Sequence, residues 1–177
     1  MKIKIFILSC LLAIIAIHAN AKDVDFSVDG FDYAITSATD LTVKVVNGPN
    51  QAFVKVPSSV VFNERTFRVT EIGNKSFYNH TELKSVDMPS ITDISDGYSS
   101  VGSRYGAFSN CSNLQHVNMP SVIYIGDYAF DDCEALASVD MPVATSIGSS
   151  AFSECYLLDK CRHASSNIHW RLCVLWL

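Results

Sequence analysis

Apolar residues recur with a period of 22 residues through positions 72–158 of this 177-residue chain. Each unit reads Ile-Gly-x-x-Ala-Phe-x-x-Cys-x-x-Leu-x-x-Val-x-Met-Pro and is clearest at residues 125–142. An earlier copy begins at Ile72, with Ser76 and His80 in the Ala and Cys positions, and a last copy fades after Leu158. The pattern predicts a chain built from one repeated structural unit.

Within each unit, the Val-x-Met spacing indicates a strand. Val139 and Met141 are two residues apart and are expected to face inward, so that Ser138 and Asp140 face outward. Pro142 has no backbone N–H to donate and is expected to end the strand.

The other half of each unit is expected to form a short helical turn. Phe130 and Cys133 are three residues apart, which places them on one side of such a turn, and Gly126 allows a tight corner. One unit cannot bury its apolar side alone, whereas stacked units share a continuous core. The predicted fold is an α/β repeat solenoid, mostly β, with short helical turns.

The units resemble the BspA-like leucine-rich repeat, which has the same Ile-Gly-x-x-Ala-Phe-x-x-Cys signature at a similar period. The resemblance implies a secreted or surface-displayed protein that takes part in adhesion and binds extracellular host or cell-surface proteins. No enzymatic activity belongs to this type of repeat, so the chain is not expected to be an enzyme, and no cofactor is expected.

Residues 22–71 are expected to form an N-terminal β cap with a degenerate first repeat. Val54-x-Val56-Pro57 has repeat character, and a hairpin is predicted from residues 60–62 and 66–69 with a turn near Asn63-Glu64. A solenoid needs a cap because its first repeat otherwise exposes an apolar end. An independent small β domain is the alternative.

Nine residues, roughly 96–104, are inserted into one repeat. Added surface-loop length costs little free energy, so this segment reads either as a tolerated loop or as a contact loop. The candidate contact residues are Tyr98, Arg104 and Tyr105, because Tyr and Arg are enriched at interfaces.

Residues 1–21 read as a secretory signal, with Lys2 and Lys4 before an apolar run and Ala19-Asn20-Ala21 as a cleavage site. Lipidation of Cys10 and a retained anchor are the alternatives, although the apolar run is shorter than a membrane span. Removing Lys2 and Lys4 takes the net charge from -5 to -7, which argues against nucleic acid and anionic membrane as partners.

The tail, residues 159–177, departs from the repeat. Cys161 and His163 stand where Val and Met are expected, and the end of the chain is apolar and uncharged. It reads either as a C-terminal cap or as an abnormal end. In the second case the chain is a truncated or frame-shifted remnant of a longer surface repeat protein, without a binding function of its own.

Cys111, Cys133 and Cys155 occupy one position of successive units and are expected to be buried free thiols. Pairing of Cys161 with Cys173 stays open, and zinc-type residues in the tail match no tight metal motif. No hydrolase or phosphate-binding motif is present, so no catalytic, metal or cofactor site is predicted.

The outward positions of the predicted strands are the candidate binding face. They form a narrow, polar, mildly acidic strip, expected to bind a protein partner: Ser85, Asp87, His116, Asn118, Ser138 and Asp140.

Overall fold

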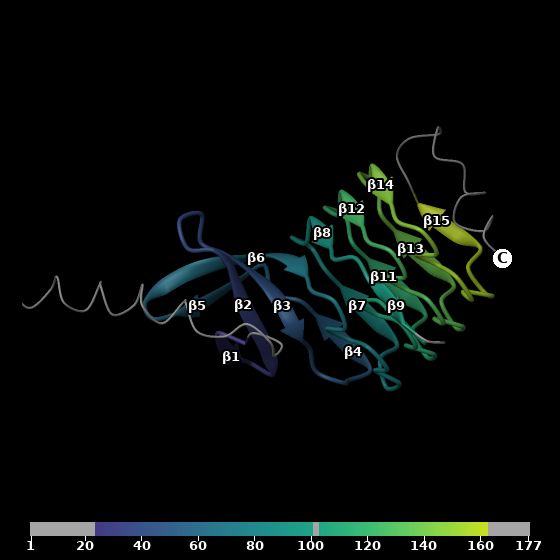
Figure 1. Ribbon diagram of the computed structural model, residues 1–177, viewed down its shortest axis with the longest axis horizontal. Coiled ribbons are helices and arrows are strands. Elements are labelled where there is room, and N and C mark those ends of the chain that lie inside the picture. Colours follow the sequence, from purple (N-terminus) through teal and green to yellow (C-terminus); the bar gives the residue numbers. More distant parts are fainter. Residues whose placement is uncertain (1–23, 101–102, 163–177) are drawn as a thin grey trace, which may run out of the picture.

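The computed structural model describes residues 24–100 and 103–162, which form two main sheets and one separate hairpin. Figure 1 shows the strands of the two main sheets succeeding one another along the long axis of the molecule, from β1 near one end to β15 near the other. Neighbouring repeats therefore contact each other along the whole described part of the chain.

The first sheet begins with the N-terminal segment. Strands β1 (Phe26–Val28), β2 (Phe31–Ser37) and β3 (Thr42–Asn47) pair in order and antiparallel. Strands β5 (Ser59–Phe62) and β6 (Arg65–Ile72) form the predicted hairpin.

The turn of this hairpin lies at Asn63 and Glu64, whose φ angles are 49° and 61°. Two consecutive residues with positive φ are typical of a tight hairpin turn whose twist matches that of the strands. The hairpin predicted from the sequence is confirmed at this point.

The repeats extend the first sheet with two-residue strands. Strand β6 pairs in parallel with β3 and with β8 (Asp93–Ile94), and the sheet continues through β12 (Tyr124–Ile125) to β14 (Ser146–Ile147). The inner isoleucine is completely buried in β8 and β12.

The second sheet is wholly parallel, and the strand order follows the sequence: β4 (Phe53–Lys55), β7 (Ser85–Asp87), β11 (His116–Asn118), β13 (Ser138–Asp140) and β15 (Lys160–Arg162). Strand β3 belongs to the first sheet and β4 to the second. The N-terminal segment is therefore bonded to the repeats through backbone hydrogen bonds in both sheets.

The predicted short helical turns are wrong for the described residues, where these segments are hydrogen-bonded turns. Tyr128 and Asp132, on either side of Phe130, have φ angles of 55° and 59°, which a right-handed helix does not admit. The amide of Phe130 donates to Ala151 of the next repeat at 2.7 Å rather than along its own segment. These turns therefore bond neighbouring repeats together.

A column of parallel phenylalanine rings fills the core on the turn side. The ring centroids of Phe77, Phe108, Phe130 and Phe152 follow one another at 4.8, 4.9 and 5.2 Å, with interplanar angles of 5° or less. Distances of this size are typical of offset stacking, which adds to the free energy gained by burying the rings.

The thiols of Cys111, Cys133 and Cys155 lie beside this column, free and buried. Each donates to the carbonyl oxygen of a phenylalanine in the preceding repeat, at 3.0, 3.2 and 3.1 Å respectively. Burial raises the pKa of the Cys133 thiol well above its usual value. The thiols thus serve as small packing residues with a satisfied S–H. The side chain of Cys161 and all of Cys173 lie outside the described residues.

Candidate functional site

The candidate binding face lies on the second sheet. Strands β7, β11 and β13 each place a valine inward, at Val86, Val117 and Val139, which are at most 3% exposed. The residues on either side of each valine point outward because side chains alternate along a strand. All six residues predicted from the sequence lie on this outer surface.

These six residues form two rows across the sheet. Ser85, His116 and Ser138 are in register in the first row, and Asp87, Asn118 and Asp140 are in register in the second. His116 Nδ1 lies 2.7 Å from Ser138 Oγ, and Asn118 Nδ2 donates to Asp87 Oδ1 at 2.7 Å. The structure therefore brings the predicted residues together, and each row contains a side-chain hydrogen bond between adjacent strands.

The centre of the face is a shallow, open hollow of about 400 Å³. Five of the six candidates line it, together with Val117 and Val139: Ser85, His116, Asn118, Ser138 and Asp140. Asp87 lies at its edge, where it accepts the Asn118 hydrogen bond. An open hollow of this kind suits contact with a protein surface better than the enclosure of a small substrate.

Strand β4 extends both rows by one residue, which the sequence analysis missed. Phe53 is in register with Ser85, and Lys55 is in register with Asp87. Phe53 is 75% exposed, so the face has an apolar residue at its edge rather than being polar throughout. The repeat character of Val54-x-Val56-Pro57 was the signal that could have identified both flanking residues.

Lys55 Nζ lies 3.5 Å from Asp87 Oδ2, and both side chains are exposed. An exposed pair of this kind contributes at most about 1 kcal/mol to stability and exchanges readily for other partners. The Asp87 carboxylate is therefore paired with Lys55 in the free protein and is still exposed to solvent.

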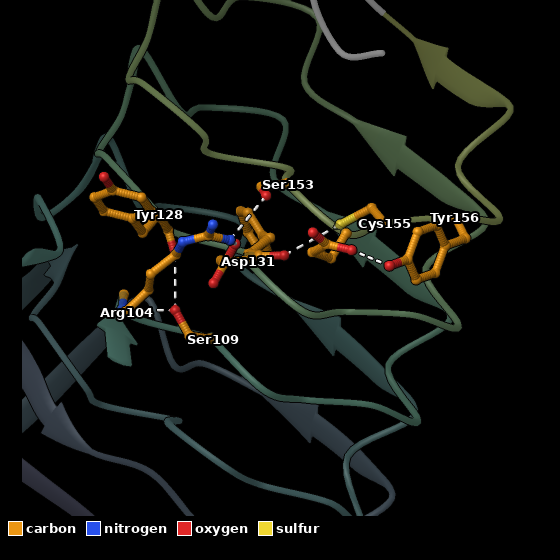
Figure 2. A network of polar contacts seen from close by, with 10 residues as sticks. Arg104, Ser109, Tyr128, Asp131, Ser153, Cys155 and Tyr156 are labelled. Atoms are coloured by element: carbon orange, nitrogen blue, oxygen red, sulfur yellow. Dashed lines mark hydrogen bonds and ion pairs between the residues drawn. The ribbon is translucent and has the colours of Figure 1, made fainter. Parts of the chain in front are cut away.

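The insertion is a β-hairpin of β9 (Tyr98–Ser100) and β10 (Ser103–Tyr105). Tyr98 is 49% exposed. The Arg104 side chain is 44% exposed, and its Nη1 donates to Asp131 Oδ1 at 2.8 Å (Figure 2). Of the predicted contact residues, Tyr98 and Arg104 are more than a third exposed, and the Arg104 guanidinium is already bonded within the protein.

Asp131 is the charged residue most deeply buried among those described, at 1% exposure. Burial raises the pKa of its carboxyl group, and hydrogen bonds from Arg104 and Ser153 partly offset that rise. The same ion pair raises the pKa of the Arg104 guanidinium.

Metal and membrane sites find no support in the described part of the chain. Residues 24–100 and 103–162 contain no cluster of three His, Cys, Asp or Glu side chains able to hold a metal ion. Of the zinc-type residues in the tail, His163, His169 and Cys173 lie outside those ranges. Over the same residues, no helix has the length and hydropathy that a membrane crossing requires.

A family model described as "BspA type Leucine rich repeat region" matches residues 50–169 in six copies. A search of curated proteins found no significant match.

Solved structures of similar fold come from bacteria. A leucine-rich repeat protein from Bacteroides capillosus matches with a TM-score of 0.64 at 24% identity, over 80% of this chain and 99% of that one. One from Bacteroides ovatus has a TM-score of 0.56 at 25% identity, covering 78% of this chain and 41% of that one. The pneumococcal vaccine antigen PcpA has a TM-score of 0.57 at 19% identity, covering 84% of this chain and 40% of that one.

Proposed function

Because the chain belongs to the family of BspA-type leucine-rich repeat proteins, we propose that it is a secreted or surface-exposed module that binds extracellular proteins through its second sheet. The observation that carries the proposal is the two-row outer face of β7, β11 and β13, with its open hollow. Repeat proteins of this kind are binding scaffolds, and the proposed activity is non-enzymatic adhesion. We also infer that the repeats form a solenoid, which the in-order parallel pairing of β4, β7, β11, β13 and β15 supports.

The proposed contact combines an apolar anchor with polar complementarity. Phe53 offers an exposed ring at one end, and the hydrogen-bonded rows offer donors and acceptors in fixed positions. Aromatic anchors carry much of the binding energy at protein interfaces, and polar groups fix the orientation. The surface is small, so a modest affinity is expected from this chain alone.

Binding of the purified protein to immobilised extracellular matrix and plasma proteins tests this proposal. For any partner that binds saturably, Asp87→Lys combined with Asp140→Lys is expected to weaken binding at least tenfold, and Phe53→Ala to weaken it as well. Asp40→Lys combined with Asp93→Lys makes the same change in net charge away from the second sheet and serves as the control. If the two charge-reversed proteins bind equally well, the face is not the site.

The remnant hypothesis rests on the sequence of the tail, of which residues 163–177 are not described. It stays a prediction. Reading the coding DNA beyond Leu158 in the other two frames tests it, because further repeat units there would establish a frameshift.

A further inference from the structure

Hairpin β9–β10 stands apart from the two main sheets. Its pairing joins Tyr98 to Tyr105 and Arg104 to Ser99, and it forms a sheet of its own. A two-stranded hairpin in water is marginally stable at best. Contacts with the repeats must therefore hold it in place.

The first of these contacts is made by Arg104. Its Nη1 atom bonds Asp131 Oδ1 at 2.8 Å and Ser153 Oγ at 3.2 Å (Figure 2). Asp131 belongs to the next repeat and Ser153 to the one after it. Because the Asp131 carboxylate is buried, losing its cationic partner would leave an uncompensated charge, so the contact is costly to break.

The second contact is made by Lys75, from the repeat before the insertion. Its Nζ atom lies 3.6 Å from the ring centroid of Tyr105, 4.9 Å from that of Tyr98 and 5.9 Å from that of Tyr78. Cations within about 6 Å of an aromatic ring are attracted to its face. Lys75 thus contacts the hairpin from the preceding repeat, whereas Arg104 links the hairpin to the two repeats that follow.

Two hydrogen bonds to backbone carbonyls complete the attachment at the base of the hairpin. The Gly97 amide donates to the Asp127 carbonyl at 2.7 Å, and Asn74 Nδ2 donates to the Tyr105 carbonyl at 3.1 Å. The hairpin is therefore bonded to repeats on both sides of the one that contains it.

We propose that Arg104 and Lys75 are positioning residues, which fix hairpin β9–β10 in one orientation and present the half-exposed Tyr98 ring as a preformed contact for a protein partner. The inference rests on the proposed protein-binding function. A contact element ordered before binding does not lose its conformational entropy on binding, and a tyrosine ring supplies a large contact area with few rotatable bonds. On this account the insertion is an ordered contact element in its own right and not a tolerated loop.

Amide hydrogen exchange of β9 and β10 in the intact protein tests the positioning role, with no partner needed. The wild-type hairpin is expected to be protected. Arg104→Ala combined with Asp131→Asn removes the ion pair without leaving a buried charge. This double variant is expected to raise amide exchange in the hairpin at least tenfold, while the unfolding temperature of the repeats changes little. Lys75→Ala is also expected to raise amide exchange in the hairpin. Arg104→Lys keeps the positive charge and is expected to retain part of the protection that the double variant loses.

Arg65→Ala is the matched control, because Arg65 is an exposed arginine in the other hairpin, β5–β6. It should leave exchange in β9 and β10 unchanged. Unprotected amides in the wild-type hairpin, or a double variant that exchanges as slowly as the wild type, would overturn the positioning role. Neither result would bear on binding by the second sheet, so failure of this inference and failure of the proposed function remain distinguishable.

Discussion

His80 Nε2 lies 2.9 Å from the carbonyl oxygen of Gly48. One repeat later, the Cys111 thiol bonds the Phe77 carbonyl in the same manner. Gly48 also donates its amide to Ser76, as Phe77 donates to Ala107. Gly48 therefore occupies the phenylalanine position of the first, degenerate repeat, and the phenylalanine column ends against its Cα.

Gly48→Ala should destabilise the protein strongly. A Cβ added at Gly48 would lie 2.0 Å from Cε1 of the Phe77 ring, which is itself packed against Phe108. Overpacking of this kind typically costs about 1–3 kcal/mol. Urea unfolding followed by circular dichroism measures the loss. Ser58→Ala, at an exposed position of the same segment, should stay within about 0.5 kcal/mol of the wild type.

Phe108→Ala should remove about 3–5 kcal/mol from the free energy of unfolding, because it opens a cavity in the middle of the ring column. Phe108 is completely buried and stacks on both Phe77 and Phe130. Phe53→Ala is the matched control, since that ring is exposed and its loss should change the free energy of unfolding little. Similar losses for the two variants would contradict the described core.

Arg104→Ala should destabilise the protein by about 1–3 kcal/mol at neutral pH, because it leaves the buried Asp131 carboxylate without its cationic partner. Burial raises the pKa of Asp131 in the folded state above its ordinary 3.8. The folded state thus binds a proton more tightly than the unfolded one, and the free-energy cost of burying the Asp131 carboxylate diminishes as pH falls through that raised pKa. The stability gap between Arg104→Ala and the wild type should therefore narrow as pH falls.

Unfolding temperatures of Arg104→Ala between pH 7 and pH 4, compared with those of the wild type over the same range, measure this effect. Arg104→Ala combined with Asp131→Asn should recover most of the loss at pH 7 and show no narrowing of the gap at lower pH. A gap between Arg104→Ala and wild type that is constant with pH would show that the Asp131 charge is not its cause.

Alkaline pH should unfold the protein partly through Tyr33. Burial raises the pKa of this 1%-exposed side chain to about 12, so the folded state retains a proton that the unfolded state loses near pH 10. The stability that this proton linkage contributes is present below pH 10 and is lost as pH rises towards 12. Tyr33→Phe should flatten the stability curve above pH 10.

Absorbance at 295 nm during a pH titration provides a second check. The hydrogen bond from Tyr124 to Asp96 raises the pKa of Tyr124 to about 12 as well, so two tyrosines should ionise late. Tyr124→Phe should remove one late step while leaving the Tyr33 step in place.

The strand face could be predicted from the sequence because alternation fixes which side chains point outward. Ser138 and Asp140 flank an inward valine in a unit whose period is regular, and the same rule placed His116 and Asn118. The phenylalanine and cysteine columns follow from the same 22-residue register.

The turns were mispredicted because their conformation depends on partners in the next repeat. Tyr128, Asp132 and Glu154 have positive φ although none is a glycine, so the residue types at these positions did not indicate a non-helical turn. The bonds of Arg104 likewise depend on Asp131 and Ser153, which are 27 and 49 residues away in sequence. Local pattern alone does not reveal an ion pair of that kind.

The bonds that Arg104 makes to two later repeats have a mechanical consequence. When repeats contact only their nearest neighbours, stability is approximately a sum over single repeats and their interfaces, so one repeat can unfold without the next. The bonds from Arg104 to Asp131 and Ser153 cross two successive repeat boundaries. When the chain is stretched from its ends, we expect the repeats that carry these residues to give way together, as one longer extension step than any single repeat would give.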